Sequence, residues 1–132
     1  MAKPARPTDA ELEILTVLWS RGPSTVREVH DIITRRRPAR YTTVLKLLQI
    51  MDEKGLVRRD QKQRAHIYAP AQSREVTQRQ LAGDLLQRAF NGSPQSLMLG
   101  ALGARKTSRE DLAELRRLLD EYEKGQYGRE KP

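Results

Sequence analysis

The feature that most constrains the fold of this chain is an abrupt change of apolar spacing at Gly55. Just before it, four apolar side chains recur at intervals of three and four residues: Val44, Leu47, Leu48 and Met51. This spacing predicts a helix from residue 42 or 43 to residue 54, and Gly55 stands where helices often end on a left-handed residue. Two short β-prone runs follow, residues 56–59 and 66–69, and the polar stretch between them predicts a β-hairpin with a charged tip.

Two further helices are predicted earlier in the chain by capping boxes, in which two side chains satisfy each other's free backbone N–H groups. The pairs are Thr8 with Glu11 and Thr25 with Glu28. The first helix should end near residue 20 and the second before residues 35–38. Three helices followed by a hairpin is the order of a winged helix-turn-helix, and the alternative is an unrelated small α+β domain.

The C-terminal half returns to helical patterns, over residues 75–90, 93–102 and 108–125. These segments contain too few large apolar residues to close a core comfortably alone, so we expect two copies of the chain to pack together. A three-helix satellite packed on the first domain is the alternative. The residues expected at the dimer interface are Leu86, Phe90, Leu97, Leu112, Leu115, Leu118, Leu119 and Tyr122.

The expected fold class is therefore mainly α with a small β-hairpin. Residues 1–70 are predicted to form a winged helix DNA-binding domain, and residues 71–125 a helical dimerisation domain. Residues 126–132 are polar and are predicted to be a disordered tail.

The net charge of +8 is concentrated in the first half of the chain. Residues 1–70 contain 14 Lys and Arg against 8 Asp and Glu, a net charge of +6, whereas residues 71–132 contain 11 against 9, a net charge of +2. This asymmetry favours a nucleic-acid-binding part joined to a nearly neutral part. The alternative is a basic protein whose charge serves only solubility.

The helix over residues 42–54 is the predicted recognition helix, because its outer face is polar and its acidic pair lies late in the helix. The candidate DNA-binding residues on and beside it are Arg40, Tyr41, Thr42, Thr43, Lys46 and Gln49, and those of the hairpin are Arg58, Arg59, Lys62 and Arg64. Thr and Gln can hydrogen-bond base edges, while the hairpin arginines suit phosphates. The alternative for these residues is an ordinary solvated surface.

Catalytic, metal and membrane functions find little support in the sequence. The chain has no cysteine, which excludes thiolate metal sites and disulfides and is consistent with a cytoplasmic protein. His30 and His66 lack the spacing of a metal site, no catalytic constellation can be assembled, and no cofactor is expected. No apolar run is long enough to insert into a membrane.

Four blocks of the sequence, taken together, resemble one family. They read PTDAELEILTVLW at 7–19, YTTVLKLLQIMDEKGLV at 41–57, RAHIYAP at 64–70 and SPQSLMLGAL at 93–102. This combination resembles the BlaI/MecI/CopY family, the penicillinase-repressor type of bacterial transcriptional regulator. The resemblance covers nearly the whole chain.

The resemblance implies a homodimeric repressor that binds a palindromic operator in double-stranded DNA. In the β-lactam systems of the family, a membrane sensor-protease acts indirectly and leads to cleavage between Asn and Phe in the dimerisation region. Gly100 and Ala101 stand at the corresponding pair here, which departs from the cleavage pattern. The copper-responsive branch binds metal through cysteines, and this chain has none. A competing hypothesis is a winged-helix protein-interaction adaptor without sequence-specific DNA binding.

Overall fold

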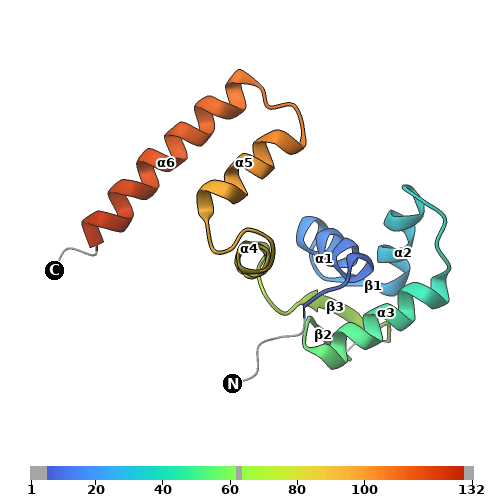
Figure 1. The fold of residues 1–132 in the computed structure, drawn as a ribbon. Helices are drawn as coiled ribbons and strands as arrows, with labels where there is room; N and C mark the ends of the chain where they lie inside the picture. The colour runs from blue at the N-terminus through green and yellow to red at the C-terminus, as the bar shows by residue number, and fades with distance from the viewer. Residues whose placement is uncertain (1–5, 62–63, 130–132) are drawn as a thin grey trace. The chain divides into compact units, whose positions relative to one another are not determined.

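The computed structural model describes residues 6–61 and 64–129, and Figure 1 shows their helices and strands. The chain forms two compact units that divide between Asp84 and Leu85. The first unit contains α1 (Asp9–Arg21), β1 (Ser24–Thr25), α2 (Val26–Thr34), α3 (Tyr41–Lys54), β2 (Val57–Asp60), β3 (Ile67–Pro70) and most of α4 (Arg74–Ala89). The second contains the end of α4, α5 (Pro94–Ala104) and α6 (Arg109–Arg129). The predicted fold class, mainly α with a small β-hairpin, is confirmed, and the hairpin belongs to a three-stranded sheet.

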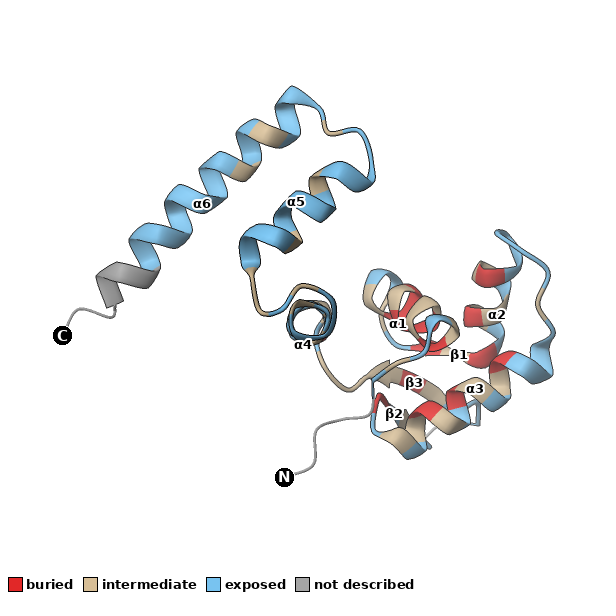
Figure 2. Ribbon diagram, viewed as in Figure 1, coloured by how far each residue is buried: buried red, intermediate tan, exposed pale blue. Residues whose placement is uncertain are grey.

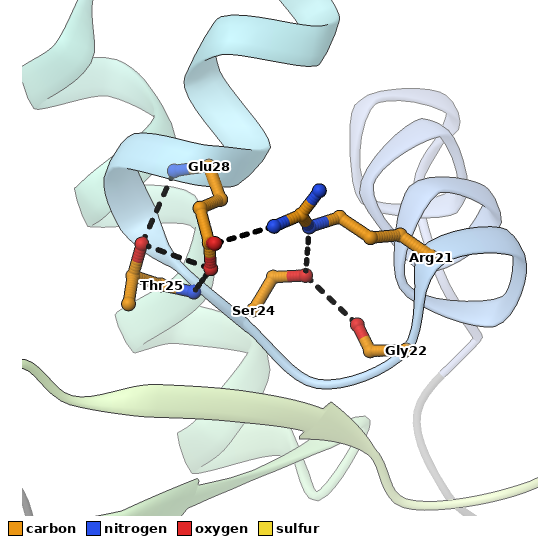
Figure 3. Close-up of polar contacts among 5 residues, drawn as sticks. All are labelled: Arg21, Gly22, Ser24, Thr25 and Glu28. Atoms are coloured by element: carbon orange, nitrogen blue, oxygen red, sulfur yellow. Dashed lines mark hydrogen bonds and ion pairs between the residues drawn. The ribbon is translucent and has the colours of Figure 1, made fainter.

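Both predicted capping boxes are present at the starts of α1 and α2. The Thr8 hydroxyl accepts from the Glu11 N–H at 3.2 Å, and the Glu11 carboxylate accepts from the Thr8 N–H at 2.9 Å. The Thr25 and Glu28 pair repeats this arrangement with the same two distances (Figure 3). Each pair satisfies backbone donors that a helix start otherwise leaves without a partner.

The core of the first unit lies where α1, α2 and α3 meet the sheet, and Figure 2 shows the buried residues gathered on these elements. Val44, Leu48 and Met51 are buried on α3, as the apolar spacing predicted. Leu47 belongs to the same stripe but is only partly buried, because it lies at the edge of the core cluster. Burial of one face of α3 leaves its opposite face in solvent.

The hairpin is part of a three-stranded antiparallel sheet with the order β1-β3-β2. The two-residue strand β1 was not predicted, because two residues are too few to show an alternating pattern. Ser24 of β1 pairs with Tyr68, while Val57 of β2 pairs with Pro70. The sheet therefore ties the hairpin to the segment between α1 and α2.

Polar contacts close the turn between α1 and α2 (Figure 3). The Arg21 side chain donates to the Ser24 hydroxyl at 3.1 Å and forms an ion pair with Glu28. The Ser24 hydroxyl in turn donates to the Gly22 carbonyl oxygen at 2.8 Å. Glu28 thus serves both the N-cap of α2 and the end of α1, and these hydrogen bonds, that of the Thr25 N–H first, hold its pKa below the ordinary value.

The boundary between the units lies later than the predicted division between residues 70 and 71, because the start of α4 packs on the first unit. The Trp19 indole N–H donates to the Gln72 carbonyl oxygen at 3.0 Å, and the Arg74 guanidinium lies 6.0 Å from the centre of the Trp19 ring. Thr77 is buried, and Arg6 forms an ion pair with Asp84 at 2.7 Å. These contacts join residues too far apart in sequence for a pattern to reveal.

In the second unit, α5 and α6 bear out the helices predicted over residues 93–102 and 108–125, but α6 extends further. It runs to Arg129, so residues 126–129 are helical where a disordered tail was predicted. Gly125 was expected to end this helix, yet a glycine inside a helix costs only about 1 kcal/mol relative to alanine. The prediction for residues 130–132 lies outside the described residues.

A buried carboxylate ties α1 to the end of α3. The Glu11 side chain is only 2% exposed, and both of its oxygens lie 2.9 Å from the Lys54 ammonium, whose side chain is 30% exposed. Burial alone raises the pKa of Glu11, but the Thr8 N–H and the Lys54 ammonium outweigh it, and the pKa lies below its ordinary value. The carboxylate is thus stabilised in its charged form.

Replacing Lys54 by methionine keeps the aliphatic stem and leaves Glu11 without its cation. We expect a loss of about 2 kcal/mol in unfolding free energy at neutral pH, measured by urea denaturation. A carboxyl whose pKa is lowered by folding contributes stability above its ordinary pKa, and this contribution disappears as the pH falls through the folded-state pKa. The loss in Lys54→Met should therefore shrink at about pH 3. Lys46→Met, at an exposed position of the same helix, is the control, and an equal loss at both pH values would contradict the assignment.

Candidate nucleic-acid interface

The start of α3 is open, unlike the starts of α1 and α2. Its N-cap residue, Arg40, makes no side-chain cap hydrogen bond, and the first turn contains no acidic residue. The Arg40 carbonyl oxygen accepts from Thr43 and Val44 at 3.1 and 3.2 Å, so the helix itself is regular from its first turn. An uncapped helix start presents N–H groups and the positive end of the helix dipole, which favour an anion such as a phosphate.

The outward face of α3 carries the predicted polar residues. Thr42, Thr43, Lys46 and Gln49 are all exposed, as is Arg40 directly before the helix. They lie opposite the buried stripe, so the packing of α3 on the core fixes which residues face out. This face contains hydrogen-bond donors and acceptors suited to base edges together with cations suited to phosphates.

Tyr41, also predicted to contact DNA, is partly engaged within the protein. Its ring packs against the His30 ring of α2 with centroids 5.7 Å apart and an interplanar angle of 75°. The residue is 41% exposed, and the contact with His30 covers part of its ring. Nothing in the spacing of the sequence indicated that the two rings meet.

The hairpin residues are not equivalent. On β2, Arg58 is exposed and lies opposite Ala69, whereas Arg59 is half-buried and lies opposite Tyr68. Because side chains alternate between the faces of a strand, Arg58 and Arg59 point to opposite faces of the sheet, and one DNA surface cannot face both of them equally. Arg64 is exposed in the turn, and Lys62 lies outside the described residues.

The basic run between α2 and α3 divides into two kinds of residue. Arg37 is held by Glu13 of α1, with Nε and Nη2 donating to one carboxylate oxygen at 3.2 and 2.6 Å. These hydrogen bonds raise the pKa of Arg37 above its ordinary value. Arg35 and Arg36 are exposed. The long-range partner of Arg37 is invisible in the sequence, because α1 and the α2–α3 connection are brought together only by folding.

A surface pocket of about 470 Å³ opens beside the first turns of α3. Its floor includes Ile14, Ile33 and Val44, and its polar lining residues are Arg37, Arg40 and Thr43. Arg37 and Arg40 line it, and because the charge of Arg37 is balanced by its ion pair with Glu13, Arg40 supplies the positive charge. The pocket extends the anion-favouring surface from the start of α3 toward α1.

In the described parts of the chain, no group of three His, Cys, Asp or Glu side chains is placed to hold a metal ion. Within the same residues, no helix is both long and apolar enough to span a membrane. His30 Nε2 donates to the Ala39 carbonyl oxygen at 2.8 Å, and His66 is exposed just before β3.

The second unit leaves much of its apolar surface uncovered. Five of the eight predicted interface residues are half-buried, namely Leu86, Phe90, Leu97, Leu112 and Leu115. The other three are exposed: Leu118, Leu119 and Tyr122, the last by 68%. Leu99 of α5, which was not among the predicted residues, is 72% exposed.

The predicted cleavage pair, Gly100 and Ala101, lies inside α5 and is exposed. A Cβ atom on Gly100 would lie 3.1 Å from Cε1 of Phe90, so the Phe90 ring packs directly on the backbone of α5 at this glycine. A side chain at position 100 would force that ring to move.

Comparison with known proteins shows which family the chain is similar to. The model of the penicillinase repressor family matches residues 7–121. Similar relatives are the transcriptional regulator BlaI of Mycobacterium tuberculosis, 38% identical over 95% of this chain and 91% of the relative, and the penicillinase repressor of Bacillus licheniformis, 25% identical over 92% and 95%.

Among solved structures, the DNA-binding domain of the repressor BlaI in solution matches with a TM-score of 0.50 and 24% identity. The match covers 56% of this chain and 90% of that domain, and it shows the winged helix fold. Because the family model spans most of the sequence and a relative of 38% identity covers nearly all of it, the chain belongs to the penicillinase repressor family of transcriptional regulators.

Proposed function

We propose that this protein is a homodimeric repressor that binds a palindromic operator in double-stranded DNA and has no catalytic activity of its own. The observation that carries the proposal is the open, non-acidic start of α3 with its exposed polar face, in a chain of this family. The protein would be located in the bacterial cytoplasm, where the operator DNA is.

In this proposal α3 enters the major groove. Thr42, Thr43 and Gln49 reach base edges, and Arg40 and Lys46 bind phosphates or bases near the first turns of the helix. Arg58 and Arg64 of the hairpin bind the phosphate backbone, which adds affinity but carries little sequence information. Arg59, being half-buried on the other face of β2, contributes less.

The dimer is proposed from the uncovered apolar side chains of the second unit. A two-fold dimer presents two recognition helices related by the same symmetry as a palindrome, so each half-site meets an identical surface. Burying Leu118, Leu119 and Tyr122 against a second copy would remove their exposed apolar surface from water.

Derepression by cleavage at Gly100 and Ala101, with a membrane sensor-protease acting upstream, would need a local change of structure. A protease binds its substrate as an extended chain, and this pair is helical. Unwinding α5 there would also release the Phe90 ring from Gly100. Cleavage would therefore follow a local opening of α5.

The first test of the DNA-binding residues is the double variant Lys46→Ala with Arg64→Ala. Fluorescence anisotropy with duplex DNA from the promoter of its own gene should show affinity at least about tenfold weaker, since each lost charged contact is worth about 1.5 to 3 kcal/mol before compensation. The matched control is Arg105→Ala with Lys106→Ala, which removes two exposed charges between α5 and α6. Unchanged binding by the first variant would contradict the contact assignment, and wild-type binding without sequence preference would favour a protein-interaction adaptor.

Salt dependence tests the phosphate contacts separately. The logarithm of wild-type affinity should fall steeply and linearly with the logarithm of salt concentration, because each neutralised phosphate releases counterions. If Arg58 binds one phosphate, Arg58→Ala should reduce the slope by about 0.9. The half-buried neighbour supplies the comparison, because Arg59→Ala should change the slope less. A flat salt dependence of the wild type would contradict phosphate binding.

The dimer is tested by Leu119→Glu, which puts a charge on a side chain that is 55% exposed and lies in the apolar stripe of α6. Light scattering after size exclusion should give a dimer for the wild type and a monomer for this variant, because an unpaired buried charge is costly at an interface. Ala113→Glu adds the same charge to an exposed position on the opposite side of α6 and should remain dimeric. A monomeric wild type would refute the dimer.

A further inference from the structure

A histidine of α2 is hydrogen-bonded to the residue just before the N-cap of α3. His30 Nε2 lies 2.8 Å from the carbonyl oxygen of Ala39. Because a carbonyl oxygen only accepts, Nε2 carries the proton and donates it in this bond. Ala39 directly precedes Arg40, whose own carbonyl oxygen begins the hydrogen-bonded ladder of α3. The bond therefore links α2 to the residue from which the first turn of α3 departs.

The same imidazole also contacts the first residue of α3. Its ring meets the Tyr41 ring edge to face, with the centroids 5.7 Å apart. His30 is half-buried and thus touches the chain on both sides of Arg40. The stretch from Arg35 to Pro38 is exposed, and the Arg37 side chain ties it to Glu13 of α1. Between that tether and the helix, Ala39 packs against the core cluster, and His30 holds its carbonyl oxygen.

We propose that His30 is a positioning residue for DNA recognition, which acts through its hydrogen bond to Ala39 to aim the first turn of α3 at the bases. The proposal rests on the proposed function and adds a residue that does not itself touch DNA. Hydrogen bonds to base edges weaken steeply when the distance lengthens or the angle departs from linear, whereas charges attract phosphates over longer distances. Losing the hydrogen bond from His30 to Ala39 should therefore reduce discrimination between DNA sequences more than general affinity for DNA.

Two substitutions separate the donor from the ring. His30→Phe keeps an aromatic ring beside Tyr41 but has no donor for Ala39. His30→Gln loses the ring but places an amide N–H three bonds from Cβ, as far as Nε2 of the histidine. If the donor positions α3, the glutamine variant should behave like the wild type and the phenylalanine variant should not. If His30 only fills space, the order should be reversed.

The measurement is anisotropy with two duplexes, one selected from random DNA by the wild-type protein and one of random sequence. For His30→Phe we expect affinity for the selected duplex to fall about tenfold, equivalent to about 1.4 kcal/mol, with affinity for the random duplex within about twofold. His30→Gln should recover most of the loss. Ile32→Val is the matched control, since it trims a core-packed side chain of the same helix that does not line the pocket beside α3, and it should keep the wild-type ratio of affinities.

Hydrogen exchange of the backbone N–H groups of Thr43 and Val44, which donate to the Arg40 carbonyl oxygen, gives a readout without DNA. Exchange there should be faster in His30→Phe than in the wild type and His30→Gln, because the first turn is released. Unchanged exchange in His30→Phe, or a glutamine variant that binds like the phenylalanine variant, would overturn the inference. If the wild type shows no preference for any duplex, the proposed function fails, and the exchange result still decides whether His30 holds α3.

Discussion

The packing of one face of α3 against α1, α2 and the sheet is the interaction on which the rest of the molecule depends. Val44, Leu48 and Met51 lie in the same buried cluster as Tyr68 of β3, so helix and hairpin share one core. Once that face is buried, the rotation of α3 about its axis is set, and Thr42, Lys46 and Gln49 must face solvent. Gly55 then turns the chain, because its φ of 81° is a left-handed conformation that glycine adopts without strain.

The helices of the first unit differ in how their N-termini are satisfied. At α1 and α2 a carboxylate occupies the positive end of the helix, and each is neutralised further by a cation, Lys54 for Glu11 and Arg21 for Glu28. At α3 no internal anion takes that place. A helix start without its own anion costs some stability, and the cost is recovered only when an external anion binds.

Much of the first unit could be predicted from the sequence, because capping boxes and helical spacing act over three or four residues. The capping boxes of Thr8 and Thr25 and the buried stripe of α3 are of this kind. What could not be predicted depends on distant partners: strand β1 exists only because Ser24 meets Tyr68, and Arg37 finds Glu13 across the fold. The role of His30 and the packing of the start of α4 depend in the same way on contacts that no local pattern encodes.

Dimerisation would strengthen DNA binding through the free energy of linking two half-site contacts, without any residue taking part in both. In the proposed dimer, linking two winged helices would make the encounter with the second half-site intramolecular, which multiplies affinity without adding contacts. In that proposal the second unit, whose α5 and α6 bury none of their described residues fully, would control repression through dimerisation. Any event that separates its two copies, including opening of α5 around Gly100, would return each recognition helix to the weak affinity of a single site.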